Sequence, residues 1–542
     1  MINMLGKRRQ AGLFEADALY LDFVGRDSFY GFLASQRGRL FRDEDFAAMY
    51  CGDNGRNSVP PSVLATALVL QTHDKVSDEE ARQRATYDVR WKVALGVELE
   101  VQPFAKSTLA EFRARLVAHE QSRAVFEASL KVARKHGFFH FRRKLKVALD
   151  TTNILGRGAV KDTYNLLADG IVVVLRVLAM QAGEPVDAWA SKAGYERYLS
   201  AASLKGQASI DWDDASQRQR FLQTIVADAD RLLEVVRLAR GRVPAGSAQD
   251  AALRTAAGLL SRVLVQDIER QVSGPELKQE VSRDRMPSVH DPDMRHGRKS
   301  HSKRFDGHKA HLAVDTDSQL IVAVDVAAGN AGDAEPALAL VEQVEASTNC
   351  PVELTIGDCA YGGGDTRQAF ADAGRTLIAK VPASTNQGCY PKRAFSIDPQ
   401  AGTCTCPAGQ VTSRLRTKRR TTDHTRQEFQ FAAAVCRACP LQAACRRGTR
   451  GRTVQLHPQE ALLQAARTVQ DSPGFRQYVS ARQVVEHRFA RLVQLGIRQA
   501  RYFGRPKTLF QLLLAAAVAN LTLLAHTPTP AGVAVVCTLA VG

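Results

Sequence analysis

The spacing of apolar residues changes at residue 144. Before this point apolar residues recur every three or four positions, as in KSTLAEFRARL, where Leu109, Phe112 and Leu116 share one helical face. From residue 144 the sequence KLKVALDTTNIL alternates apolar and polar positions, which predicts a β-strand that ends at Asp150. We therefore expect a helical N-terminal domain over residues 1–140, with a DNA-binding or dimerisation role, and a sheet domain after it.

The segments that follow predict a mixed α/β sheet. Two β-rich runs around the turn DTDSQ predict a hairpin over 309–329, followed by a helix over 333–346. PVELTIGD and TLIAKVP predict two further strands with a helix between them. The sheet domain is expected over 141–184 and 286–384, interrupted by a charged helical insertion over 185–285.

The remainder divides into a cysteine-rich basic insertion (385–455), C-terminal helices of the sheet domain (456–526) and a Pro-punctuated tail (527–542) without an assignment. The apolar run 509–525 approaches the length of a membrane span, but Gln511 and Asn520 interrupt it, which favours a buried core helix. The N-terminus lacks the pattern of a signal peptide. We expect a cytoplasmic protein without a membrane partner.

The charge of the chain favours a polyanionic partner. Lys and Arg number 73 and Asp and Glu 56, giving a net charge of +17, which is typical of proteins that bind nucleic acid but also fits enzymes with anionic substrates. A composition of 45% hydrophobic and 24% charged residues excludes a wholly disordered chain.

Three carboxylates are candidates for chemistry. Asp150 and Asp358 follow predicted strands, where the loops of an open α/β sheet gather functional side chains. Glu486 lies four residues after Arg482 on a predicted helix. Each also has a structural interpretation, as a turn or cap residue for the aspartates and as a surface ion pair for Glu486. Three converging carboxylates would suit a pair of Mg²⁺ ions that promote phosphoryl transfer.

A basic segment precedes or forms one of the predicted strands. Residues 295–311 hold six Lys or Arg, four His and one Asp. A solvated loop would have the same composition, but the position beside the carboxylates favours a strip that contacts DNA phosphates. Its predicted contact residues are Arg298, Lys299, Lys303, Arg304 and Lys309, and Arg482 on the later predicted helix is a further expected DNA contact.

Five cysteines lie close together in the second insertion. Cys404 and Cys406, then Cys436 and Cys439, then Cys445 have the spacing of a structural zinc site. We expect Zn²⁺ on Cys406, Cys436, Cys439 and Cys445, with Cys404 left over, while free thiols in a loop are the alternative. Residues 414–452 also hold eleven Lys or Arg against two acids, and Arg419 and Arg420 are expected to contact DNA.

The chain resembles the DDE transposases of bacterial insertion sequences, in the broad group of Tn5-like and IS4-like enzymes. The resemblance covers nearly the whole chain and is carried by several segments together: SDEEARQRATYDVRWKVALG, FAKSTLAEFRARL, VALDTTNI, DPDMRHGRKSHSKRFDGHKAHLAVD, AGNAGDAEPAL, TIGDCAYGGGDTR, CRACPLQAAC and RYFGRPKTLFQLLLAAAVANL.

The resemblance implies an RNase H-like catalytic core that binds two divalent ions and cuts and rejoins DNA ends. It maps the catalytic acids onto Asp150, Asp358 and Glu486. Related enzymes carry a Tyr, Arg, Glu, Lys signature on the last helix. Here Arg482 and Glu486 match its spacing, whereas Tyr478 is one residue too far from the arginine and Val493 stands at the lysine position.

The resemblance further implies double-stranded DNA as the substrate and a homodimer in the DNA complex, because two element ends must be held together. Three other functions remain open from the sequence. The chain could be a domesticated protein that binds DNA without cutting it, or a metal-dependent nuclease that never joins strands. A more distant alternative is a zinc-stabilised structural protein with no DNA role.

Overall fold

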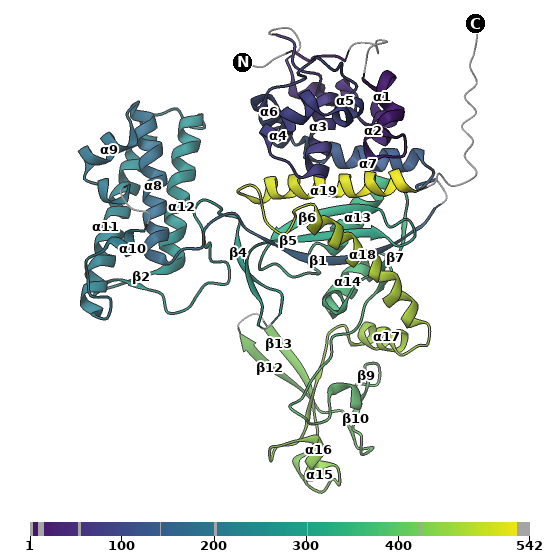
Figure 1. Cartoon of the computed structure of the whole chain (residues 1–542). Helices are drawn as coiled ribbons and strands as arrows, with labels where there is room; N and C mark the ends of the chain where they lie inside the picture. Colours follow the sequence, from purple (N-terminus) through teal and green to yellow (C-terminus); the bar gives the residue numbers. More distant parts are fainter. Residues whose placement is uncertain are drawn as a thin grey trace.

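The computed structural model describes residues 4–8, 16–51, 56–140, 143–199, 203–300, 302–421 and 424–527. Figure 1 shows a helical N-terminal domain above a central sheet, a separate group of helices to one side, and a small module of short strands and helices below the sheet. All but the first residue of the tail over 527–542 lies outside the described residues.

The N-terminal domain is built from helices that the capping residues delimit. Ser77 accepts a hydrogen bond from the Glu80 amide and so begins the fourth helix. Pro61 occupies the first turn of the third helix, where the missing amide hydrogen has no cost. The helices are α1 (Ala16–Val24), α2 (Phe29–Leu40), α3 (Pro61–Asp74), α4 (Asp78–Tyr87), α5 (Val89–Leu95), α6 (Lys106–Ala118) and α7 (Ala124–Lys135).

The central sheet is mixed, as predicted. Its strands lie in the order β4-β5-β1-β7-β8, and β6 pairs with β5 beside β4. β1, β7 and β8 are parallel, whereas β4, β5 and β6 are joined by antiparallel pairing. The strands are β1 (Leu145–Leu155), β4 (Arg295–Arg298), β5 (Arg304–Asp315), β6 (Ile321–Ala328), β7 (Val352–Ile356) and β8 (Leu377–Ile378).

Two boundaries differ from the sequence prediction. β1 does not end at Asp150 but continues to Leu155, because β5 pairs with it as far as Gly307. The helix expected from residue 333 begins only after Pro336, as α13 (Ala337–Thr348). The predicted hairpin is present as β5 and β6.

The last helix of the chain, α19 (Arg505–His526), packs between the N-terminal domain and the sheet (Figure 1). Asn520 is fully buried; it accepts a hydrogen bond from the Ile321 amide at 2.9 Å and donates one to the Ile321 carbonyl at 2.8 Å. Within the described chain, α19 and α8 (Thr163–Ala182) are long and apolar enough to span a membrane, with 78% and 56% of their most apolar windows buried in the protein. The expectation of a buried core helix at 509–525 agrees with this packing.

The helical insertion begins earlier than residue 185. The buried residues of α8, expected to belong to the sheet domain, join one apolar core with those of α11 and α12. Figure 1 shows this bundle apart from the sheet. Besides α8 it contains α9 (Val186–Ala193), α10 (Leu204–Gln207), α11 (Ala215–Arg240), α12 (Ala248–Asp267) and a hairpin of β2 (Ile268–Gln271) and β3 (Gly274–Leu277).

A cysteine-rich module, residues 385–455, separates β8 from the C-terminal helices. A small apolar core around Phe395, Phe429 and Val454 holds it together. Its elements are β9 (Ser396–Asp398), β10 (Thr403–Thr405), β11 (Val411–Thr412), β12 (Leu415–Thr421), β13 (His424–Gln430), β14 (Thr453–Leu456), α15 (Ala433–Arg437) and α16 (Gln442–Cys445).

Candidate active site

Strand register brings Asp150 toward Asp358. β1 and β7 run parallel and pair Ala148 with Ile356, the last residue of β7. Asp150 comes two residues after Ala148 and is still within β1. Asp358 comes two residues after Ile356 and lies in the turn that follows β7. Asp150, in the middle of β1, therefore lies beside the carboxyl end of β7, where Asp358 stands; strand ends of this kind are where open α/β sheets present functional groups.

The turn after β7 is tight, and glycines permit it. Asp358 accepts a hydrogen bond from the Ala360 amide at 2.9 Å and begins a short 3₁₀ helix, Cys359–Tyr361. A side chain at Gly362 would collide with the Lys380 carbonyl, and one at Gly357 would meet the Tyr361 ring. Asp358 is thus a cap residue, one of the two interpretations of the sequence, while its position also serves a site at the sheet edge.

Glu486 and Arg482 come from α18 (Phe475–Gln494), which packs against β1 and β5. Buried Val485, Phe489 and Leu492 fix the helix. Arg482 donates from Nη1 to Asp150 Oδ2 at 2.9 Å and from Nη2 to Glu486 Oε1 at 2.5 Å. One guanidinium therefore links a carboxylate of the sheet to one of the helix.

The environment of Asp150 disfavours its negative charge. Burial raises the pKa of this carboxyl above its ordinary value, and the nearby Asp358 adds to the effect. The Thr151 amide and Arg482 act in the opposite direction without reversing it. Tyr361 has a pKa raised well above its ordinary value by burial and then by Asp150, Asp333 and Asp358, so its hydroxyl remains protonated. The region is rich in negative charge and would be stabilised by a cation.

Among the described residues, no three His, Cys, Asp or Glu side chains are grouped closely enough to hold a metal ion as they stand. At the carboxylates, the Arg482 guanidinium is the cation that Asp150 and Glu486 share. The donors are nevertheless hard carboxylate oxygens on rigid elements, which is the chemistry that Mg²⁺ prefers.

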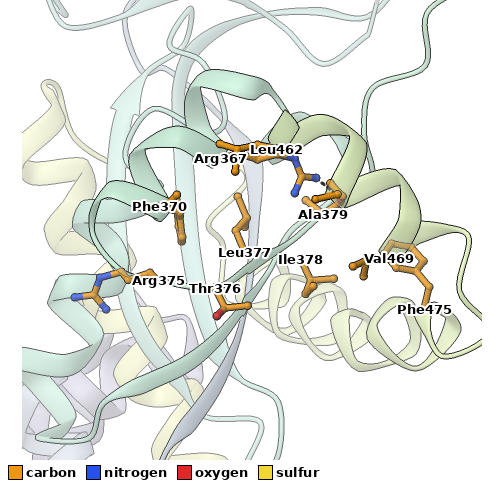
Figure 2. A pocket seen from close by; sticks show the side chains of 13 residues that line it. Arg367, Phe370, Arg375, Thr376, Leu377, Ile378, Ala379, Leu462, Val469 and Phe475 are labelled. Carbon is orange, nitrogen blue, oxygen red and sulfur yellow. Dashed lines mark hydrogen bonds between the residues drawn. The ribbon is translucent and has the colours of Figure 1, made fainter. Parts of the chain in front are cut away.

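Two hollows adjoin this region. Asp358, Lys380, Tyr478 and Arg482 line one of them together with apolar side chains. The second is shown in Figure 2, where Arg367, Phe370, Leu377 and Leu462 line a largely apolar space between α14 (Gly364–Asp372), β8 and α17 (Glu460–Gln470). Ile378 and Phe475 line both. The hollow with the charged groups is the one suited to a polar substrate.

The predicted basic strip lies on the β4–β5 hairpin. Arg298, Lys299, Lys303 and Arg304 are exposed, and Arg298 lies opposite Arg304 in the strand pairing. Lys309 differs from them, because its ammonium is 2.6 Å from the Asp333 carboxylate and donates to the Ala331 carbonyl. Sequence reasoning missed Asp333; its place in AGNAGDAEPAL was a signal only of the family resemblance.

Cys406, Cys436, Cys439 and Cys445 line one small hollow of the cysteine-rich module, although no three of them are grouped closely enough to hold a metal ion as they stand in the described structure. The other three cysteines each raise the pKa of Cys445, although burial is the largest cause. Cys404 instead lies in the apolar core, where burial raises its pKa to about 11. The side chains of Arg419 and Arg420 lie outside the described residues.

Two family models match the chain. A model described as "Transposase DDE domain" matches residues 405–525, which include the four thiols, Arg482 and Glu486. A model described as "Transposase domain (DUF772)" matches residues 22–115 in the N-terminal domain. No curated protein and no solved structure matches. The matches confirm the resemblance to DDE transposases of insertion sequences, and the mixed sheet is consistent with the RNase H-like core expected of them.

Proposed function

We propose that this chain, which matches two transposase family models, is a DDE transposase that cleaves the ends of a DNA element and joins them to target DNA, with Asp150, Asp358 and Glu486 as its catalytic acids. The observation that carries the proposal is the link through Arg482, which joins Asp150 on the sheet to Glu486 on α18 beside Asp358. Two acids separated by hundreds of residues thus contact the same guanidinium.

The acids fit a pair of Mg²⁺ ions, because their oxygens are hard donors and burial disfavours an uncompensated charge on Asp150. When bound, such ions activate an attacking oxygen and stabilise the leaving oxygen of an in-line displacement. The protein's own part is to hold the acids on rigid elements and to keep a cationic guanidinium, Arg482, beside the scissile phosphate.

The reaction needs no covalent link between protein and DNA. Water first attacks the phosphodiester at the element end and releases a 3′-hydroxyl, which then attacks a phosphodiester of the target and displaces its 3′-oxygen. The exposed residues of the β4–β5 hairpin supply positive charge along the DNA path. Because two ends must be joined together, we propose a homodimer in the DNA complex; action on DNA fits the cytoplasm of a bacterium.

We further propose that the cysteine-rich module is folded by one Zn²⁺ on Cys406, Cys436, Cys439 and Cys445. Four thiols around one hollow match the ligand number of a structural zinc site. The module has only a small apolar core, so a metal would contribute much of its folding free energy.

The test is strand cleavage and strand transfer on a duplex that carries the element end, with Mg²⁺ present. Asp150→Ala and Glu486→Ala are expected to abolish both reactions, whereas Glu353→Ala, an exposed acid on β7, retains them. Cleavage by either active-site variant would overturn the assignment. Wild-type binding without cleavage would instead favour a domesticated DNA-binding protein, and cleavage without transfer would favour a nuclease.

A further inference from the structure

A two-stranded ribbon extends from the cysteine-rich module. β12 and β13 pair Arg416 with Glu428 and Lys418 with Arg426. The third strand, β14, pairs only with residues 427–430 of β13. Residues 424–426 of β13 therefore pair with β12 alone. Figure 1 shows the ribbon below the central sheet.

The two faces of the ribbon differ in chemistry, because side chains alternate along each strand. One face carries Phe429, which is buried in the core of the module. The opposite face carries Arg416, Lys418 and Arg426, which we call the basic face. Arg416 and Lys418 are exposed, and the Arg426 side chain is 41% exposed.

Among the described residues of the ribbon, one acid, Glu428, lies between these cations. The Glu428 side chain is only 7% exposed, and its carboxylate is 3.0 Å from Lys418 Nζ and 3.5 Å from Arg426 Nε. Both partners remain far more exposed than the acid itself. Glu428 therefore forms an ion pair with each of the two cations while leaving the surface positive.

We propose that the basic face of the β12–β13 ribbon binds the phosphates of duplex DNA, and that Glu428 is a positioning residue for Lys418 and Arg426. Two strands about 4.8 Å apart carry cations on one face and so present positive charge to the phosphates. The inference rests on the proposed function and assigns it a DNA contact in the module rather than in the catalytic sheet.

Binding of the full-length protein to a fluorescent duplex, measured over a range of salt concentrations, tests the proposal. The triple variant Arg416→Gln, Lys418→Gln, Arg426→Gln is expected to bind at least tenfold more weakly. Its plot of log affinity against log salt becomes shallower by about 0.9 for each phosphate that the protein no longer neutralises. The matched control, Arg220→Gln, Arg242→Gln, Arg254→Gln in the helical insertion, removes the same charge from exposed positions and keeps the wild-type slope.

Glu428→Gln separates positioning from net charge. This variant is one unit more positive than the wild type, so attraction by net charge alone predicts tighter binding, whereas a positioning role predicts binding several-fold weaker. Glu428→Asp keeps the carboxylate and is expected to recover most of the affinity. An unchanged thermal unfolding profile shows that neither variant has lost the module's fold.

The outcomes distinguish the two proposals. If the wild type binds and cleaves DNA but the ribbon triple variant keeps its affinity and salt slope, the ribbon assignment is wrong and the proposed function stands. If Glu428→Gln binds more tightly, the positioning role is wrong. If the wild type binds no duplex at any salt concentration, both proposals fail.

Discussion

Arg482 donates to Asp150 at 2.9 Å although 332 positions separate them in the chain. The same guanidinium holds Glu486 one helical turn away, so its rigid fork fits two carboxylates at once. A lysine ammonium, which is a single charge on a flexible side chain, cannot reproduce this geometry. The relationship fixes α18 relative to β1 and makes Arg482 part of the arrangement of acids, in addition to its expected contact with DNA.

Replacement of Arg482 by lysine is therefore not conservative. We expect Arg482→Lys to lower the rate of strand cleavage by about tenfold or more, equivalent to at least about 1.4 kcal/mol in the activation free energy. Single-turnover cleavage with Mg²⁺ measures this effect. Arg476→Lys, an exposed position on the same helix, is the control and should cleave at the wild-type rate. Full activity of Arg482→Lys would show that one amine suffices.

The charge on Asp150 is expected to reduce stability at neutral pH. Because its folded-state pKa is raised, the folded protein binds the proton more tightly than the unfolded chain does. The resulting destabilisation is absent at pH values below the ordinary pKa of 3.8 and grows as the pH rises through the raised value. Asp150→Asn should thus resist urea better than the wild type at pH 7 while being inactive.

The advantage of Asp150→Asn should shrink as the pH is lowered toward 3.8. Asp372→Asn, an exposed position on α14, is the control and should leave the urea midpoint unchanged at both pH values. A urea midpoint for Asp150→Asn below that of the wild type at pH 7 would mean that the ion pair with Arg482 outweighs the cost of burial.

The sequence predicted the mixed sheet and the β5–β6 hairpin because alternation and turn residues are local signals. It did not predict the end of β1, because the strand continues to Leu155 only through pairing with β5. It assigned α8 to the sheet domain, whereas α8 packs in the core of the helical insertion. The sequence of an apolar helix does not indicate which core will bury it. The sequence also did not predict interactions that depend on tertiary packing, such as the ion pair of Lys309 with Asp333.

The proposed active site shows the same division. Strand-end position and helical spacing singled out Asp150, Asp358 and Glu486 from local pattern, and the family resemblance gave them one role. The bridging role of Arg482 depends on how α18 crosses β1, which no spacing encodes. From the sequence this arginine was expected to contact DNA and to pair with Glu486, but not to bind Asp150.

The amount of bound zinc should depend on Cys406, Cys436, Cys439 and Cys445 but not on Cys404. Cys436→Ser and Cys439→Ser are each expected to lower the bound zinc from one ion per chain to near zero and to destabilise the module, because a structural site needs all its thiolates. Cys404→Ala should keep its zinc, since that side chain lies in the apolar core. Metal analysis of the purified protein measures both. A wild-type protein free of zinc would overturn the assignment.

His311 should make the sheet sensitive to acid. Burial lowers its pKa from the ordinary 6.5 to about 4, so the unfolded chain takes up a proton that the folded chain resists. Stability from this residue is complete above pH 6.5 and is lost as the pH falls toward 4, at up to about 1.4 kcal/mol per pH unit. His311→Asn should lose less stability over that range, as urea unfolding at pH 7 and pH 4.5 would show. An identical loss in both proteins would exclude His311 as the cause.

Asn520 joins α19 to the sheet through both backbone groups of Ile321. Asn520→Ala leaves the amide and the carbonyl of Ile321 without their side-chain hydrogen-bond partner at a fully buried site. A buried polar group without a partner costs about 1–3 kcal/mol. We expect faster hydrogen exchange at the Ile321 amide and a lower urea midpoint. Lys507→Ala, exposed on the same helix, is the control and should change neither quantity. If exchange at Ile321 stays at the wild-type rate, the packing of α19 against β6 protects this amide without the asparagine.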